Sequence, residues 1–118
     1  MQMIDTGADD VLGILVDGKV DEEDVKRVWT LAEERLEKHE KLRVYVELES
    51  FDGITLKATL EDLKQVFRNF RRFERKAIVS DKSWLGTFTK IGDKLFPSIE
   101  VKHFAPSEKD AALEWAKG

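Results

Sequence analysis

Cysteine is absent from this chain of 118 residues. The absence excludes disulfides, thiol catalysis, thiolate metal sites and redox switching. Only two histidines are present, and their positions give no spacing that supports a metal site. No serine is flanked by the glycines of a nucleophile elbow, and no glycine-rich loop that could hold a phosphate is found. The composition therefore predicts a protein that is not an enzyme and has neither a cofactor nor a metal.

Long apolar runs are also absent. None approaches the ~20 residues that a membrane-spanning helix needs. The first five residues lack the basic start and apolar stretch of a signal peptide, so we expect a cytoplasmic protein. A chain of this length can bury roughly two thirds of its unfolded surface in one core. With no repeat, linker or low-complexity segment, residues 1–118 are predicted to form a single domain.

Short apolar runs predict the strands. Five segments have this pattern: 3–6, 11–16, 42–48, 77–79 and 99–104. The first two are joined by Gly7-Ala8-Asp9-Asp10, a turn by composition, which favours an antiparallel hairpin. Residues 42–48 alternate apolar and polar side chains, so we place this strand towards an edge of the sheet. The fully apolar run at 77–79 is predicted to be a central strand.

Apolar residues at helical spacing predict about four helices. They are a first helix opened by the acidic residues 21–24, helices at 56–70 and 84–96, and a terminal helix that starts at Pro106-Ser107. The element order is then β-β-α-β-α-β-α-β-α. Strands separated by helices favour right-handed crossovers and parallel pairing, with the first strand antiparallel. We therefore predict an α/β domain with a mixed, mostly parallel sheet of four or five strands.

Three segments together resemble the SpoIIAA-like family of small bacterial proteins. They are residues 17–24 (DGKVDEED), 70–79 (FRRFERKAIV) and 80–84 (SDKSW), and the similarity extends from about Val11 to Trp115. The resemblance implies a STAS-like fold that is related to CRAL-TRIO lipid-binding domains. It also implies a non-enzymatic domain that binds an apolar ligand and associates with membrane.

STAS anti-sigma antagonists carry a phosphorylated serine in an Asp-Ser-Ser-Gly type of loop, and Ser50 occupies the similar place in this chain. The loop here reads Glu49-Ser50-Phe51-Asp52-Gly53. The surrounding motif is absent, and Phe51 stands where the family has a small residue. We therefore carry over no phosphorylation site, and Ser50 remains the candidate residue of a phospho-loop.

The predicted helix at 84–96 has an apolar arc of about 140°. An ordinary helix that faces the core needs much of that arc. The excess width and the internal Gly86 and Gly92, which weaken the helix, also favour a helix that binds an apolar ligand or lies at a membrane interface. The candidate pocket lies between this helix and the helix at 56–70, near the carboxyl ends of the central strands. Its predicted lining residues are Phe67, Phe70, Trp84, Phe88, Ile91, Leu95 and Phe96.

Residues 64–76 form a basic segment with six Lys or Arg and one Glu, a net charge of +5. Since the whole chain has a net charge of −4, the residues outside this segment carry −9. The plain interpretation is a solvated helix end whose cations complement the helix dipole. The alternative is contact with an anionic membrane surface. Its candidate residues, with those of the following helix, are Arg68, Arg71, Arg72, Lys82, Lys90 and Lys94.

The preferred function from sequence is a binding domain for a small apolar or lipid-like ligand, with peripheral membrane association. The competing function is a STAS-type regulator that works by protein–protein interaction, like an anti-sigma antagonist. The basic segment could also pair with the acidic start of the first helix in a second copy, as a homodimer. Nucleic acid is not expected as a partner, because Phe67 and Phe70 continue the core stripe of their helix and are not free to stack on bases.

Overall fold

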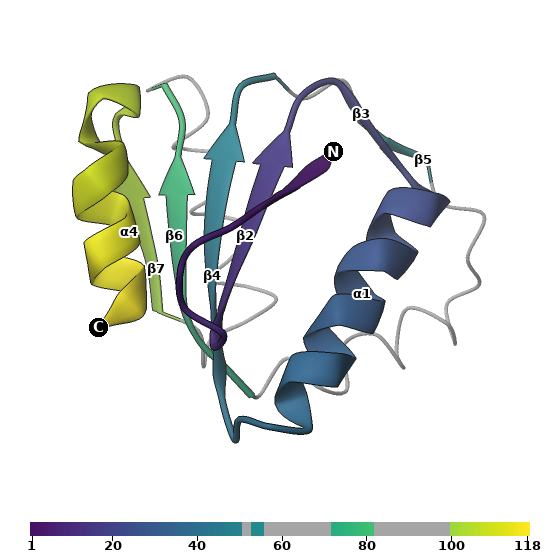
Figure 1. Cartoon of the computed structure of the whole chain (residues 1–118). Coiled ribbons are helices and arrows are strands. Elements are labelled where there is room, and N and C mark those ends of the chain that lie inside the picture. Colours follow the sequence, from purple (N-terminus) through teal and green to yellow (C-terminus); the bar gives the residue numbers. More distant parts are fainter. Residues whose placement is uncertain (51–52, 56–71, 82–99) are drawn as a thin grey trace.

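The structure, a computed structural model, describes residues 1–50, 53–55, 72–81 and 100–118 (Figure 1). Its main sheet has five strands in the order β1-β2-β4-β6-β7. The strands are β1 (Gln2–Ile4), β2 (Val11–Val16), β4 (Leu42–Leu48), β6 (Phe73–Val79) and β7 (Glu100–Phe104). The first pair is antiparallel and the other neighbours are parallel. The predicted α/β domain with a mixed, mostly parallel sheet is confirmed.

The helix α1 (Glu22–Leu36) begins at the acidic segment that the sequence singled out. Asp21 is its N-cap and accepts from the amide of Asp24 at 2.9 Å, while the Asp24 carboxylate accepts from the amide of Asp21 at 3.0 Å. Such a capping box satisfies two backbone amides that a helix start leaves free. The first turn therefore fixes where α1 begins.

Two short strands were not predicted. The strands β3 (Lys19–Asp21) and β5 (Gly53–Thr55) pair in parallel as a separate two-stranded sheet. In β3 only Val20 is buried, between two exposed charged residues. One apolar residue in three is too short a pattern to reveal a strand, so pairing with a distant segment decides this element.

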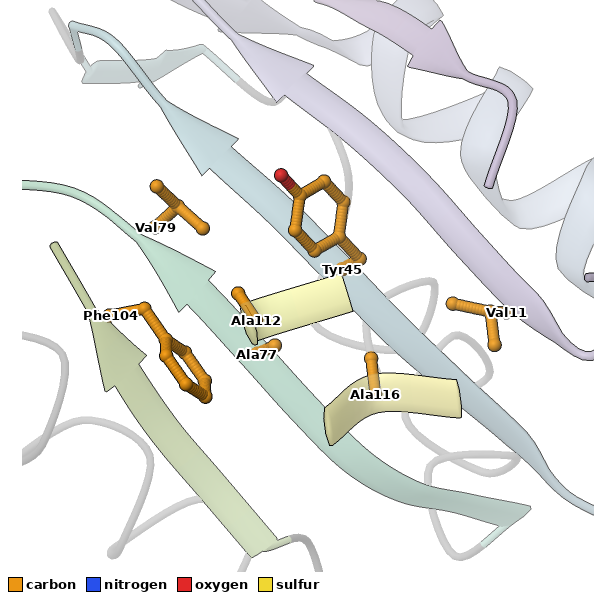
Figure 2. Close-up of a cluster of buried hydrophobic side chains, with 7 residues drawn as sticks. All are labelled: Val11, Tyr45, Ala77, Val79, Phe104, Ala112 and Ala116. Carbon is orange, nitrogen blue, oxygen red and sulfur yellow. The ribbon is translucent and has the colours of Figure 1, made fainter. Parts of the chain in front are cut away.

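One face of the main sheet, called the α4 face below, is covered by α4 (Lys109–Lys117). This helix follows a 3₁₀ turn, η3 (Pro106–Glu108). Ala112 and Ala116 of α4 are both fully buried against the strands. Their small side chains allow the helix backbone to approach the sheet closely. Figure 2 shows the resulting cluster of Val11, Tyr45, Ala77, Val79, Phe104, Ala112 and Ala116.

The opposite face, called the α1 face below, carries the second core cluster. Its buried members are Leu12, Ala32, Leu36, Leu42 and Phe73, with Trp29, Leu31 and Val44 packed beside them. Val11 and Leu12 belong to different clusters because successive side chains of a strand point to opposite sides of the sheet. Figure 1 shows α1 and α4 well separated, on either side of the sheet.

The prediction that residues 42–48 lie towards an edge is wrong. β4 is the third of five strands, paired with β2 on one side and β6 on the other. Its polar side chains are tolerated there because other elements provide partners. Arg43 pairs with Glu74 at 3.1 Å, Tyr45 is buried below α4, and Glu47 lies 3.8 Å from Lys109.

The strand predicted at 77–79 is longer than its apolar run. β6 begins at Phe73, and it lies between β4 and β7. An irregularity near its start makes Leu42 pair with Phe73 but Arg43 pair with Arg75, so Glu74 is an extra residue on β6. This bulge leaves Phe73 on the α1 face and turns Arg75 to the α4 face.

The terminal strand and helix are found where the sequence placed them. Of the about four helices expected, the described residues contain two α-helices, α1 and α4. The helices predicted at 56–70 and 84–96 lie outside the described residues.

Candidate functional site

Two rows of side chains cross the α1 face. The parallel register aligns Leu12, Val44, Lys76 and Val101 in one row and Ile14, Val46, Ile78 and His103 in the next. Leu12 and Ile78 are buried, whereas Val44, Val46 and Val101 are only half-buried. Val44 and Val46 belong to the inner strand β4, where valines of a parallel sheet are normally covered completely, while Val101 lies on the edge strand β7. The α1 face therefore keeps apolar strand surface that is accessible.

The α4 face gives the contrast. Its strand residues Tyr45, Ala77, Val79 and Phe104 are 3%, 0%, 2% and 7% exposed. Burial raises the pKa of the Tyr45 phenol, which donates to the Glu47 carboxylate at 2.7 Å. With its side chains packed and paired in this way, the α4 face offers little surface to a ligand. The accessible apolar surface lies on the other side.

Lys76 is the unexpected member of the first row. It lies between Val44 of β4 and Val101 of β7, and it is half-buried. Burial lowers the pKa of its ammonium group. Sequence reasoning counted Lys76 with the basic segment and missed its place in the sheet. The available signal was its separation from Ile78 by two residues, which in a strand means the same face.

Ser80 and His103 form a partly buried hydrogen-bonded pair at the carboxyl end of β6. His103 Nε2 lies 2.9 Å from Ser80 Oγ and 2.8 Å from the Ser80 carbonyl oxygen. A carbonyl oxygen only accepts, so Nε2 carries the proton and donates it there. A nitrogen that is already protonated cannot take the serine proton, as a catalytic base must. The pair therefore joins β6 to β7 and is not arranged as a nucleophile and its base.

Ser50 follows β4 at the edge where the parallel strands β2 and β4 end. Its hydroxyl donates to the Asp17 carboxylate at 2.7 Å, and its carbonyl accepts from the amide of Gly18 at 3.1 Å. A phosphate on this hydroxyl would be placed beside the Asp17 carboxylate, and like charges at that distance repel. No observation shows that Ser50 is modified, so a phospho-loop at this position stays a prediction.

Arg72 of the basic segment is half-buried and bound within the chain. Its guanidinium donates to the carbonyls of Leu36, His39 and Glu40, at 2.8, 3.0 and 3.0 Å. The Leu36 carbonyl belongs to the last turn of α1, where helix carbonyls lack partners of their own, and the other two carbonyls belong to the segment that follows the helix. Its role at an anionic surface stays a prediction, but the described contacts make it a cap of α1.

Arg43 and Arg75 do the same for the other helix. They are neighbours on β4 and β6, and they donate to the carbonyls of Lys117 and Trp115 in the last turn of α4. The Arg75 guanidinium also lies 5.3 Å from the centre of the Trp115 ring system, within the range of a cation–π contact. Cations at a helix C-terminus are favoured by the helix dipole.

The other predicted site residues lie outside the described residues. They are Phe67, Phe70, Trp84, Phe88, Ile91, Leu95 and Phe96 for the ligand, and Arg68, Arg71, Lys82, Lys90 and Lys94 for the anionic surface. Within the described ranges, no group of three or more His, Asp or Glu side chains could hold a metal ion. None of the helices in those ranges is long and apolar enough to span a membrane.

Comparison with known proteins identifies the family. A search of curated proteins found no match. Among solved structures, the chain is similar to an uncharacterised protein of the DUF3478 family, with a SpoIIAA-like fold, from Shewanella loihica PV-4. The two are 27% identical with a TM-score of 0.69, over 90% of this chain and 83% of that chain. The SpoIIAA-like family model matches residues 11–117, nearly the whole chain. With its STAS-like fold and this match, the chain belongs to the SpoIIAA-like family.

Proposed function

We propose that this chain is a non-enzymatic domain that binds a small apolar or lipid-like ligand on the α1 face of its sheet. The observation that supports the proposal is the partial exposure of Val44, Val46 and Val101 in parallel strands. A bound apolar ligand would remove this surface from water, at about 25 cal/mol per Å². The ligand-lining residues predicted from the sequence between 67 and 96 remain part of the proposal.

The absence of catalysis is proposed on the contacts of the described polar residues. In the part of the chain that the structure describes, Ser80 and His103 are the serine and histidine that lie in contact, and the histidine proton is directed to a carbonyl. Tyr45 is a buried phenol bound to Glu47 below α4. Neither group combines a free base with access to a substrate.

The proposal is tested by native mass spectrometry of the purified protein, which should show a co-purifying lipid, and by binding of the neutral apolar dye Nile red. Val101→Ser removes apolar surface from the α1 face. It should weaken dye binding roughly fivefold, the effect of losing about 1 kcal/mol of apolar burial.

Lys102→Ser is the matched control, because Lys102 is the exposed neighbour of Val101 in the same strand and points to the α4 face. It should leave dye binding unchanged. Equal loss in both variants, or no lipid and no dye binding in the wild type, would contradict a ligand site on the α1 face.

Peripheral membrane association is proposed on the basic residues predicted from the sequence. Anionic vesicles should change the rate of hydrogen exchange across residues 82–98. Salt at 0.5 M should abolish this change, since it screens the attraction between the basic residues and the anionic lipids. Unchanged exchange, together with no co-sedimentation at low salt, would remove the membrane from the proposal.

A second candidate function, a STAS-type regulator of a partner protein, rests on the position of Ser50 directly after β4, at the edge where the parallel strands β2 and β4 end. If the Ser50 loop is not phosphorylated, Ser50→Ala should behave like the wild type in cells. Stoichiometric phosphorylation of Ser50 in cells, found by mass spectrometry, would favour this second function and a working phosphoswitch.

A further inference from the structure

Lys76 is the most unusual residue of the α1 face. The two rows that cross this face contain Leu12, Val44, Lys76, Val101, Ile14, Val46, Ile78 and His103. Neither row contains an acidic side chain. Among the described residues, no hydrogen bond or ion pair involves the Lys76 ammonium group. A cation among valines without a counterion is costly, and such groups in native proteins need an explanation.

The acidic residues that lie next to Lys76 along β6 or in the paired part of β7 belong to the α4 face, and they already form ion pairs with arginines. Glu100 lies 3.8 Å from Arg75, and Glu74 pairs with Arg43 at 3.1 Å. His103, in the neighbouring row, donates to the Ser80 carbonyl and offers no negative charge. No described group in either row or beside it therefore neutralises Lys76.

We infer that Lys76 is the anchor for the head group of the ligand, and that the ligand is an aliphatic carboxylate. Its carboxylate would bind the ammonium group, and its chain would lie against Val44, Val46 and Val101. This inference rests on the proposed function, since it names the chemical class that the same face takes. A carboxylate supplies the counterion that no described residue gives the lysine, and the valines supply the apolar contact that the aliphatic chain of the ligand requires.

The lowered pKa of Lys76 agrees with this arrangement. Removal of water disfavours the charged ammonium group in the empty site. A bound carboxylate favours the charged form again and accepts a charge-assisted hydrogen bond from it. An uncharged ligand of the same length gains the apolar contacts alone.

The test compares dodecanoate with methyl dodecanoate, which has the same chain but no charge, by native mass spectrometry and calorimetry. The wild type should bind the carboxylate about 10- to 100-fold more tightly than the ester, the effect of one charge-assisted hydrogen bond. Lys76→Met should remove this preference and keep the affinity for the ester, since methionine is apolar and of similar length. A thermal melt checks that the variant is folded.

Lys102→Met is the matched control. It removes one positive charge from the exposed α4 side of β7 and should keep the preference for the carboxylate. Equal affinity of the wild type for carboxylate and ester would overturn the inference while leaving the apolar site in place. No binding of either compound would overturn the proposed function as well. If Lys76→Met instead changes only self-association in sedimentation, the lysine serves a second copy of the chain and the inference is wrong.

Discussion

Substitution of Arg72 by methionine is expected to destabilise the protein more than the removal of a charged side chain at the surface usually does. Its guanidinium donates three hydrogen bonds, at 2.8 to 3.0 Å, to the carbonyl of Leu36, the last residue of α1, and to the carbonyls of His39 and Glu40 just after the helix. The residue after the helix, Glu37, has an ordinary right-handed conformation, so no glycine cap satisfies these carbonyls. Hydrogen bonds to a charged group contribute about 1.5–3 kcal/mol each, but these three bonds are exposed or partly buried, so the carbonyls regain water when the side chain is removed.

We therefore expect Arg72→Met to lower the free energy of unfolding by about 2–3 kcal/mol, and the melting temperature by roughly 8–12 °C. Urea denaturation and thermal melts measure both. Arg72→Lys keeps the charge but not the planar fork, and should lose about half as much.

Arg27→Met is the control, because it removes the same charge from α1. The Arg27 side chain is 60% exposed and pairs with Asp24 at 2.6 Å. The Asp24 side chain is only 12% exposed, but the Arg27 guanidinium is in solvent, and a pair with one partner in solvent contributes about 0.5–1 kcal/mol and weakens in salt. Equal losses for Arg72→Met and Arg27→Met, or a loss at Arg72 that disappears in 1 M salt, would refute the assignment of Arg72 as the cap of α1.

Three further substitutions test other contacts. A side chain at Gly13 would meet the Ile4 carbonyl oxygen at 2.5 Å, so Gly13→Ala should displace β1 and cost about 1–3 kcal/mol in urea denaturation; wild-type stability would show that β1 yields freely. The hydrogen bond from the Asp21 amide lowers the pKa of Asp24 below its ordinary 3.8. The stabilisation by Asp24 is therefore present above that value and is lost as the pH falls through the folded pKa, and Asp24→Asn should flatten the fall in urea midpoint between about pH 5 and 2. Ile78→Asp places a charge at a position that is 3% exposed and should cost several kcal/mol, so a wild-type melt would contradict the burial of β6.

Local patterns were sufficient for much of the fold. The acidic residues at the start of α1 predicted where it begins, and the capping box of Asp21 and Asp24 explains why. The apolar run at 11–16 became β2 with the same bounds, and the segment at 42–48 became β4. These elements are determined by residues within a few positions of each other, which sequence spacing reports directly.

The position of each strand in the sheet depended on distant residues. β4 was predicted near an edge because Arg43, Tyr45 and Glu47 suggested a wet face. That face is instead covered by α4, whose residues lie more than sixty positions further along the chain. A polar residue in a strand indicates water or a partner, and the sequence alone cannot distinguish them.

The candidate site shows the same division. The sequence by itself indicated a STAS-like fold and showed that the chain lacks the residues of common catalytic motifs. It also showed that Arg72 and Lys76 belong to one basic segment. Only the tertiary structure separated these two cations. The irregular pairing between β4 and β6 and the strand register bring Lys76 into a row with Val44 and Val101, while Arg72 reaches the end of α1. Charge is a property of the residue, but its partner is set by contacts between segments far apart in the chain, and those contacts form only when the domain folds.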